Sequence, residues 1–240
     1  MWRPVEYHRR MSDLPAPTPR TVRSFVKRGG RTTLAQSRAL TQLWPSYGVD
    51  PGVGEIDLDA LYGRRAPRVL EIGFGDGESL VSRAAATPEA DFLGVEVHPP
   101  GVGHCLLLAA DAALCNMRVV RQDAIEVLTL RVAPACLSEV LIWFPDPWPK
   151  KRHHKRRIIQ PEFATLVASR LAPGGRLRFA TDWQPYAEHA LDVLNAHSAF
   201  RNRAPDSRFV ARPTERPLTK FERRGLRLGH AVYDLDYSRL

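Results

Sequence analysis

From residue 68 to the C-terminus, short apolar runs alternate with longer stretches that suit helices. The apolar runs are dominated by β-branched and aliphatic residues, as expected of buried strands. The seven predicted strands are RVLEIG (68–73), DFLGVEV (91–97), MRVVRQ (117–122), SEVLIWF (138–144), GGRLRFAT (174–181), SRFVA (207–211) and GHAVYDL (229–235). This alternation is typical of an α/β fold with a mostly parallel seven-stranded sheet and helices on both faces.

The pattern differs before residue 68. Residues 1–30 are rich in Pro, Arg and Ser and show little periodicity, which predicts a basic, disordered arm. Leucines at helical spacing predict one helix within residues 30–44, and residues 45–63 indicate a Gly- and Pro-rich loop with a short helical turn. We therefore expect a single domain over residues 31–240, preceded by the arm.

Composition narrows the class of partner. Lys and Arg number 35 against 26 Asp and Glu, a formal net charge of +9, which favours an anionic partner such as nucleic acid or a membrane surface. No stretch approaches the roughly 18 consecutive apolar residues of a membrane span, and the N-terminus lacks the apolar run of a signal peptide. A cytoplasmic location without membrane association is expected. The three cysteines form no C-x-x-C pair, so we expect neither disulfides nor a metal site.

The segment EIGFGDG follows the first predicted strand and opens a helix. Gly73 and Gly75 would let the backbone turn sharply and approach a ligand. In a dinucleotide fingerprint the third glycine would stand at Glu78, and acidic side chains there and at Asp76 oppose a pyrophosphate. A nucleoside ligand with a positive centre, such as S-adenosylmethionine, suits this loop better. Glu71 could meet its charged ammonio or sulfonium end.

Two further carboxylates stand at strand ends, where open α/β sheets bind ligands. Glu96 has two acceptor oxygens for the vicinal hydroxyls of a ribose, although it could also be a solvated glutamate. Asp123 could accept a hydrogen bond from an adenine amino group while the N–H of Ala124 meets a ring nitrogen. Asp123 could equally cap the helix that follows, and the two roles are compatible.

The segment FPDPWPKKRHHKRR follows the fourth predicted strand. Pro145 and Pro147 restrict the backbone around Asp146 and hold its carboxylate in an extended turn, which suits a reacting centre. The alternative is a rigid strand-to-helix turn with Trp148 in the core rather than stacked on a base. Residues 150–157 are all Lys, Arg or His and could neutralise RNA phosphates, or form a solvated helix face. Adjacent histidines point in different directions on a helix, which argues against a metal role.

Six segments together resemble the bacterial tRNA (guanine-N7-)-methyltransferases: LEIGFGDG, FLGVEVH, PGVGHCL, FPDPWPKKRHHKRR, ATDWQPYAEH and RPLTKFERRGLRLGH. The resemblance runs from about residue 20 to the C-terminus. It implies a Rossmann-like class I fold and methyl transfer from S-adenosylmethionine to N7 of the guanosine at position 46 in the tRNA variable loop. The sequence indicates no obligatory protein partner and leaves monomer or homodimer open.

The resemblance also implies roles for individual residues, with Asp146 as the catalytic or base-positioning residue. Those implied to bind the cofactor are Glu71, Gly73, Gly75, Glu96, Asp123, Ala124 and Asp146. Those implied to bind the substrate are Lys150, Asp182, Thr219, Lys220, Phe221 and Glu222. Those implied to touch RNA are Arg152, His153, His154, Lys155, Arg156 and Arg157.

The chemistry of guanine N7 agrees with these roles. N7 has a free lone pair, so no proton has to leave before it attacks a methyl group, and positioning matters more than a strong base. We hypothesise that Asp146 and Asp182 orient the base and offset its growing positive charge. An exocyclic-amine methyltransferase is one alternative, although such enzymes typically carry D-P-P-Y or N-P-P-Y rather than P-D-P-W. A non-catalytic RNA-binding protein is the other, and the four strand-end carboxylates argue against it.

Overall fold

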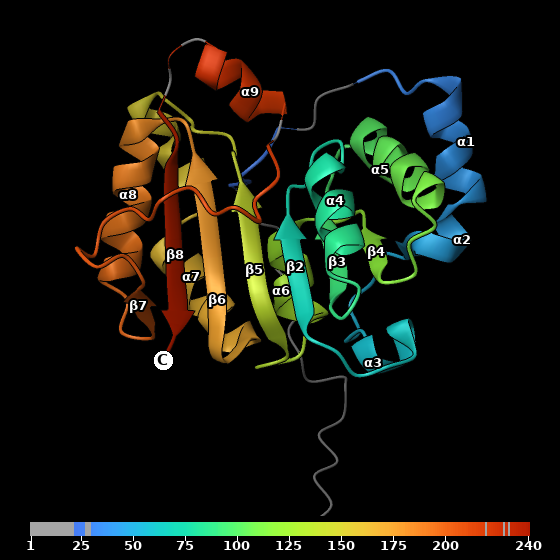
Figure 1. The fold of residues 1–240 in the computed structure, drawn as a ribbon, viewed down its shortest axis with the longest axis horizontal. Helices are drawn as coiled ribbons and strands as arrows, with labels where there is room; N and C mark the ends of the chain where they lie inside the picture. Colours follow the sequence, from blue (N-terminus) through green and yellow to red (C-terminus); the bar gives the residue numbers. More distant parts are fainter. Residues whose placement is uncertain (1–21, 27–29, 219, 228, 230) are drawn as a thin grey trace, which may run out of the picture.

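The computed structural model describes residues 22–26, 30–218, 220–227, 229 and 231–240, and at residues 220, 221, 224 and 226 it describes the backbone alone. Its strands form one eight-stranded sheet in the order β1-β4-β3-β2-β5-β6-β8-β7 (Figure 1). β8 is antiparallel to β6 and β7, and all other neighbours are parallel. The strands are β1 (Gly48–Val49), β2 (Arg68–Ile72), β3 (Asp91–Val95), β4 (Met117–Val120), β5 (Leu137–Trp143), β6 (Leu171–Thr181), β7 (Phe200–Asn202) and β8 (Tyr233–Arg239).

Helices cover both faces of the sheet (Figure 1). They are α1 (Leu34–Gln42), α2 (Trp44–Tyr47), α3 (Leu58–Tyr62), α4 (Glu78–Ala86), α5 (Pro99–Asp111), α6 (Ala124–Leu130), the 3-10 helix η2 (Lys151–Arg156), α7 (Pro161–Arg170), α8 (Gln184–Asn195) and α9 (Lys220–Arg227). One apolar cluster joins α4 and α5 to the sheet, and a second joins α6, α7 and α8 to its other face. β2 and β3 are buried at every position, which explains why most of their residues are apolar. No helix in the described ranges is long and apolar enough to cross a membrane.

The expected α/β class is confirmed, but the number and placement of strands differ from the expectation. β1 is a two-residue strand inside the expected loop. SRFVA (207–211) is not a strand, because only Val210 forms a bridge, an isolated one to Asp234. The strand that pairs with β8 on this side is β7, which lies opposite residues 237–239. β7 has only three residues and no clear alternation, so its sequence carried no strand signal. The expected helix in residues 30–44 is present as α1, and most of the expected arm lies outside the described residues.

The sheet face near β6 and β8 is covered by chain rather than by a helix. The segment between β7 and α9 crosses in front of these strands (Figure 1). Beneath it Glu139 accepts hydrogen bonds from Arg83 at 2.8 Å and Arg178 at 3.1 Å. Arg178 also pairs with Glu215 of the covering segment at 2.8 Å. Ion pairs therefore attach this segment, which leads directly to the R-P-L-T-K-F-E motif, to the sheet.

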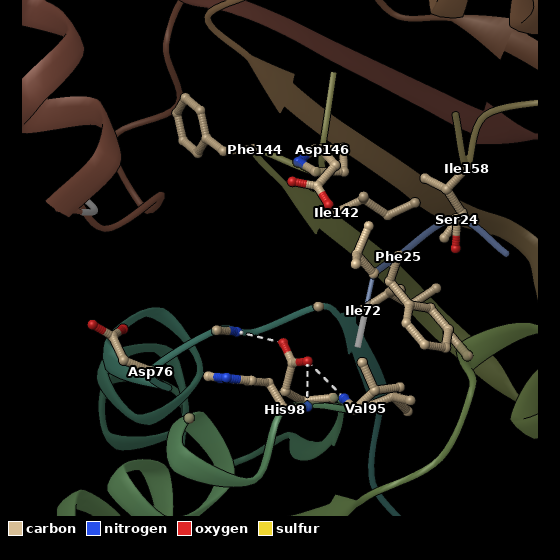
Figure 2. A pocket seen from close by; sticks show the side chains of 18 of the residues that line it. Ser24, Phe25, Ile72, Asp76, Val95, His98, Ile142, Phe144, Asp146 and Ile158 are labelled. Atoms are coloured by element: carbon tan, nitrogen blue, oxygen red, sulfur yellow. Dashed lines mark hydrogen bonds between the residues drawn. The ribbon is translucent and has the colours of Figure 1, made fainter. Parts of the chain in front are cut away.

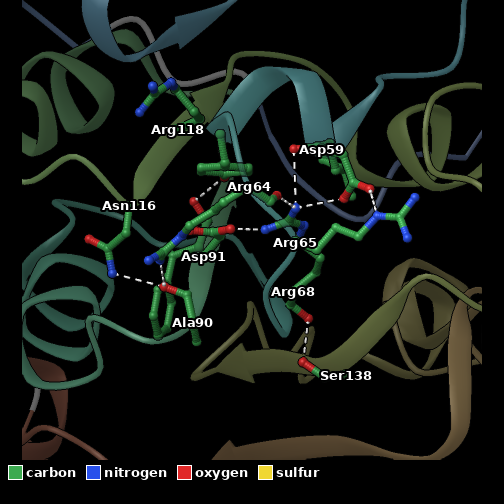
Figure 3. Close-up of polar contacts among 12 residues, drawn as sticks. Asp59, Arg64, Arg65, Arg68, Ala90, Asp91, Asn116, Arg118 and Ser138 are labelled. Atoms are coloured by element: carbon green, nitrogen blue, oxygen red, sulfur yellow. Dashed lines mark hydrogen bonds and ion pairs between the residues drawn. The ribbon is translucent and has the colours of Figure 1, made fainter.

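A second ion-pair cluster fixes α3 at the amino ends of the central strands β2 and β3 (Figure 3). Asp91, the buried first residue of β3, pairs with the buried Arg68 of β2. Arg64 also donates to Asp91 through Nε at 2.9 Å, and Arg68 reaches Asp59 of α3 at 2.9 Å. The cluster links α3, β2 and β3 far from the carboxyl ends of the strands.

Removal of the Asp91 carboxylate is expected to destabilise the fold strongly. In Asp91→Asn the buried Arg68 loses its buried partner, and breaking such a pair costs about 3–5 kcal/mol of the free energy of unfolding. Asp59→Asn is the control, because its side chain is 52% exposed and surface ion pairs contribute about 1 kcal/mol or less. Urea denaturation of both variants measures the difference, and equal losses would contradict the role given to Asp91.

Candidate functional site

A cavity of about 630 Å³ lies at the carboxyl ends of β2, β3 and β5. The strand order reverses between β2 and β5, because the chain winds from β2 toward β4 and then returns to β5. Such a reversal is where open α/β sheets bind their ligands. The cavity is lined by residues that follow each of these strands, among them Gly73, Glu96 and Asp146.

The glycine loop presents bare backbone to this cavity. Gly73 and Gly75 have φ values of +70° and +62°, in the left-handed region that favours glycine. A Cβ added to either would meet no described atom within 4 Å, so it would occupy open space at the cavity. A Cβ on Gly77 would instead lie 2.4 Å from Cβ of Cys105 in α5. The first two glycines therefore leave room for a ligand, and Gly77 lets α5 pack against the loop.

The carboxylate of Glu96 is fixed at the cavity wall. Its Oε2 accepts from the backbone N–H of Gly75 at 3.1 Å, and its Oε1 accepts from Val97 at 2.6 Å and His98 at 2.9 Å (Figure 2). A carboxylate has about four acceptor positions, and these bonds use three of them. The remaining position can accept a hydrogen bond from a ligand hydroxyl without any rearrangement of the side chain.

The charge of the cavity wall is negative. Among the described residues that line it, the acidic side chains are Asp76, Glu96 and Asp146, and the basic ones are the histidines His98 and His104. Asp146 and Phe144 lie on one side of the cavity, opposite Asp76 and His98 (Figure 2). A cavity lined by carboxylates favours a ligand with positive charge and disfavours a polyphosphate.

Glu71 and Asp123 lie outside this cavity lining. Glu71 is 1% exposed, accepts a weak hydrogen bond from Oγ of Ser79 at 3.5 Å, and burial raises its pKa to about 8. Asp123 caps α6 by accepting from the N–H of Ile125 at 2.9 Å, as one of its two interpretations predicted. It lines an adjoining cavity of about 660 Å³, and Ala124 lines the first one.

The turn that carries Asp146 is held in an uncommon backbone conformation. Phe144 and Trp148, on either side of it, have φ values of +50° and +47°, which are costly for residues other than glycine. The N–H of Phe144 donates to the carbonyl of Ala180 at 2.8 Å, and Nε of Arg157 donates to the carbonyl of Pro147 at 3.1 Å. These contacts hold the turn at both ends, and the side chain of Asp146 is exposed at the cavity.

The basic run divides into an exposed part and an anchoring residue. Lys150, Lys151, Arg152 and Lys155 are exposed on and before η2, whereas Arg157 is 3% exposed. Arg157 also donates through Nη1 to the carbonyl of Pro185 at 3.1 Å, and its guanidinium carbon lies 4.9 Å from the Tyr186 ring centroid. Arg157, for which an RNA contact is expected, is therefore buried and anchors the turn.

The aromatic residue of this turn is not a bare stacking surface. The guanidinium carbon of Arg156 lies 4.9 Å from the Trp148 ring centroid, and the His153 ring meets it edge-on at 5.8 Å. The indole N–H of Trp148 donates to the carbonyl of Ser24 at 3.2 Å. Partial burial and the surrounding cations hold the pKa of His153 below its ordinary value. Trp148 therefore packs within the basic run and against the N-terminal segment.

The expected substrate pocket is described only in part. Asp182 is half-buried directly after β6, Thr219 lies outside the described residues, and the side chains of Lys220 and Phe221 are not described. Glu222 is 1% exposed and accepts from Arg216 at 2.6 and 2.8 Å and from Arg212 at 2.8 Å. Burial opposes its ionisation, but these hydrogen bonds outweigh burial and hold its pKa below the usual range. Glu222, for which a substrate contact is expected, is thus ion-paired within the protein.

Several cavity residues had no role in the sequence-based expectation. Phe25 comes from the expected arm, and Gln36 comes from α1, which packs so closely on α5 that a Cβ on Gly103 would lie 2.8 Å from the Gln36 carbonyl. No local signal indicates either position. His98 lies two residues after Glu96, so its place at the same strand end could have been inferred. Among the described residues, no group of three His, Cys, Asp or Glu side chains could hold a metal ion.

Comparison with known proteins identifies the family and the class of fold. Residues 65–235 match the family model described as "Putative methyltransferase". A tRNA (guanine-N(7)-)-methyltransferase of Halorhodospira halophila (strain DSM 244 / SL1) is 61% identical over 220 residues, covering 91% of this chain and 95% of that protein. The protein of the same name from Pseudomonas aeruginosa (strain UCBPP-PA14) is 58% identical over 221 residues, covering 92% and 91%.

Among solved structures, the 16S rRNA methyltransferase KamB superimposes with a TM-score of 0.59 at 16% identity, covering 79% of this chain and 95% of that one. This similarity shows the fold alone. The sheet order and the family match define a methyltransferase of the Rossmann-like class I type. More specifically, the chain belongs to the family of tRNA (guanine-N(7)-)-methyltransferases.

Proposed function

We propose that this protein transfers a methyl group from S-adenosylmethionine to N7 of guanosine in tRNA. The observation that carries the proposal is a carboxylate-lined cavity with Asp146 at its wall and an exposed basic helix directly after it, in a chain of this family. The cavity suits a cationic cofactor, and η2 suits a polyanionic substrate. We further propose guanosine 46 of the variable loop as the target and the cytoplasm as the location.

The residues of the cavity fit this cofactor. The open space beside Gly73 and Gly75 admits close approach of a ligand to the backbone, and Glu96 keeps an acceptor position for a ribose hydroxyl. Ala124 and the capping residue Asp123 would hold an adenine between the two adjoining cavities. A cavity of about 630 Å³ is within the usual range of small-molecule sites. When bound, S-adenosylmethionine supplies an electrophilic methyl group.

The protein's task is then to position a guanine rather than to remove a proton from it. N7 attacks with a lone pair that is already free, so an in-line approach governs the rate. Asp146 would accept hydrogen bonds from the N–H donors of the base and would stabilise the positive charge that the base gains. Asp182 follows the adjacent strand β6 and would assist from the same edge of the sheet.

The exposed cations of the basic run are expected to set the salt dependence of tRNA binding. A side chain that pairs with one phosphate steepens the slope of log affinity against log salt by about one, so Arg152→Ala and Lys155→Ala should each flatten it. Arg65→Ala is the control. This arginine is 92% exposed and precedes β2, at the amino ends of the strands, whereas the basic run follows their carboxyl ends. Filter binding of tRNA between about 50 and 200 mM salt measures the slopes. An unchanged slope in both run variants would contradict the assignment.

The proposed function is tested by mapping the modified atom. The purified protein is incubated with unmodified tRNA transcripts and S-adenosylmethionine carrying a labelled methyl group. Label at N7 of a variable-loop guanosine, located by chain cleavage at N7-methylguanosine, is the expected result. Label on an exocyclic amine would identify the alternative class of methyltransferase, and tRNA binding without transfer would identify a non-catalytic RNA-binding protein.

A further inference from the structure

The buried guanidinium of Arg216 lies at the carboxyl ends of β5 and β6 and at the amino end of the antiparallel strand β8. Trp143, Ala180 and Asp234 are register partners across β5, β6 and β8. Arg216 has a fully buried side chain, with Nε 2.8 Å from Oδ1 of Asp234 and Nη2 donating to Oδ2 at 3.1 Å. One hydrogen bond and one close ion pair therefore join the guanidinium to β8.

The same guanidinium faces the turn that carries Asp146. Its central carbon lies 5.4 Å from the Phe144 ring centroid and 5.8 Å from that of Trp143. Phe144 is one of the left-handed residues of the turn, and Asp146 follows it by two positions. Pro145 leaves the backbone little freedom between these two residues. A change in the backbone dihedrals of Phe144 would therefore displace the Asp146 carboxylate.

The remaining contacts of Arg216 lead to the C-terminal motif. Its Nη1 and Nη2 donate to the two oxygens of Glu222 in α9 at 2.6 and 2.8 Å. Arg212 donates to the same carboxylate at 2.8 Å, but its side chain is 38% exposed. Among the described side chains, Arg212 and Arg216 pair with Glu222, and of these two only Arg216, which also pairs with Asp234, is fully buried.

We propose that Arg216 is a positioning residue for methyl transfer, which holds the Phe144 ring and thereby the Asp146 carboxylate, and that Glu222 orients Arg216. The inference rests on the proposed function. A purely stabilising role accounts poorly for the cluster, because apolar residues of similar volume often stabilise a fold as well as buried ions do. Apolar residues would not supply a planar, doubly anchored group against the ring of a strained residue.

The test compares Arg216→Lys with Arg212→Lys. Lysine keeps the charge but lacks the planar fork, so Arg216→Lys should no longer hold the Phe144 ring in place while still neutralising Glu222 and Asp234. We expect kcat for methyl transfer to fall at least about tenfold, because small displacements of a positioned group are costly. The affinity for S-adenosylmethionine, from equilibrium dialysis, should change less than about twofold. Arg212→Lys should retain kcat within about twofold.

A second measurement does not depend on activity. Deuterium uptake by the peptide covering residues 141–149 should be faster in Arg216→Lys than in wild type and Arg212→Lys, because the amide of Phe144 exchanges when the turn opens. A double-mutant cycle of Arg216→Lys with Phe144→Leu should show non-additive losses in kcat. The cycle tests whether Arg216 acts through the Phe144 ring.

The outcomes separate the inference from the proposed function. Unchanged kcat and unchanged exchange in Arg216→Lys would overturn the positioning role, as would equal losses of kcat and of cofactor affinity, which indicate general unfolding. Additive losses in the cycle would also overturn it. Absence of methyl transfer by the wild-type protein would refute the proposed function instead, and the exchange experiment would still report whether Arg216 holds the turn.

Discussion

Asp146→Ala is expected to lower kcat for methyl transfer by about 10²–10³-fold while the affinity for S-adenosylmethionine changes little. The carboxylate is exposed at the cavity on a turn fixed by two prolines and by contacts to Ala180 and Arg157. Its loss removes the group proposed to orient the guanine and to stabilise its developing charge. Single-turnover transfer to tRNA and equilibrium binding of the cofactor measure the two quantities separately.

Two further variants define what Asp146 contributes. Asp146→Asn keeps an acceptor oxygen at the same place but removes the charge, so its activity reports how much of the effect is electrostatic. Asp111→Ala is the matched control, because this aspartate is exposed at the end of α5. Full activity of Asp146→Ala would refute the assignment, as would an equal loss in Asp111→Ala.

The second large effect concerns the pH dependence of stability. Glu71→Gln is expected to be more stable than wild type at pH 8 and to lose this advantage as the pH falls toward 5. Burial raises the pKa of Glu71 to about 8 in the folded protein, whereas its ordinary value is 4.5. Between these values the folded protein holds a proton that the unfolded chain releases, so wild-type stability falls as the pH rises.

The size of the effect follows from the same linkage. One bound proton changes the free energy of unfolding by about 1.4 kcal/mol per pH unit across this window, and glutamine carries no such proton. Urea denaturation at pH 5.5 and pH 8 measures the difference between variant and wild type. Glu89→Gln, at an exposed glutamate, is the control and should follow the wild type. Parallel pH curves for Glu71→Gln and wild type would rule out a buried, proton-bearing Glu71.

The central strands could be predicted closely, and the edges of the sheet could not. β2, β3 and β5 are buried on both faces at nearly every position, so their sequences are rich in Val, Leu and Ile despite isolated polar residues. β7 has three residues and is defined by its pairing with β8, which leaves no signal in its own sequence. The second half of β8 was also missed, because Asp236 interrupts its apolar pattern and pairs with Arg176 of β6.

The sequence alone determined the central strands, the glycine loop at the end of β2 and the proline-bracketed aspartate after β5, because each depends on residues adjacent in the chain. It also placed acidic residues at the strand ends. The tertiary structure decided which of these acidic residues line the cavity. Glu96 and Asp146 line the cavity, whereas Glu71 and Glu222 are buried away from solvent, and Arg157 anchors a turn. Burial and ion pairing depend on segments distant in sequence, such as Arg216 and Phe144, so no local pattern can report them.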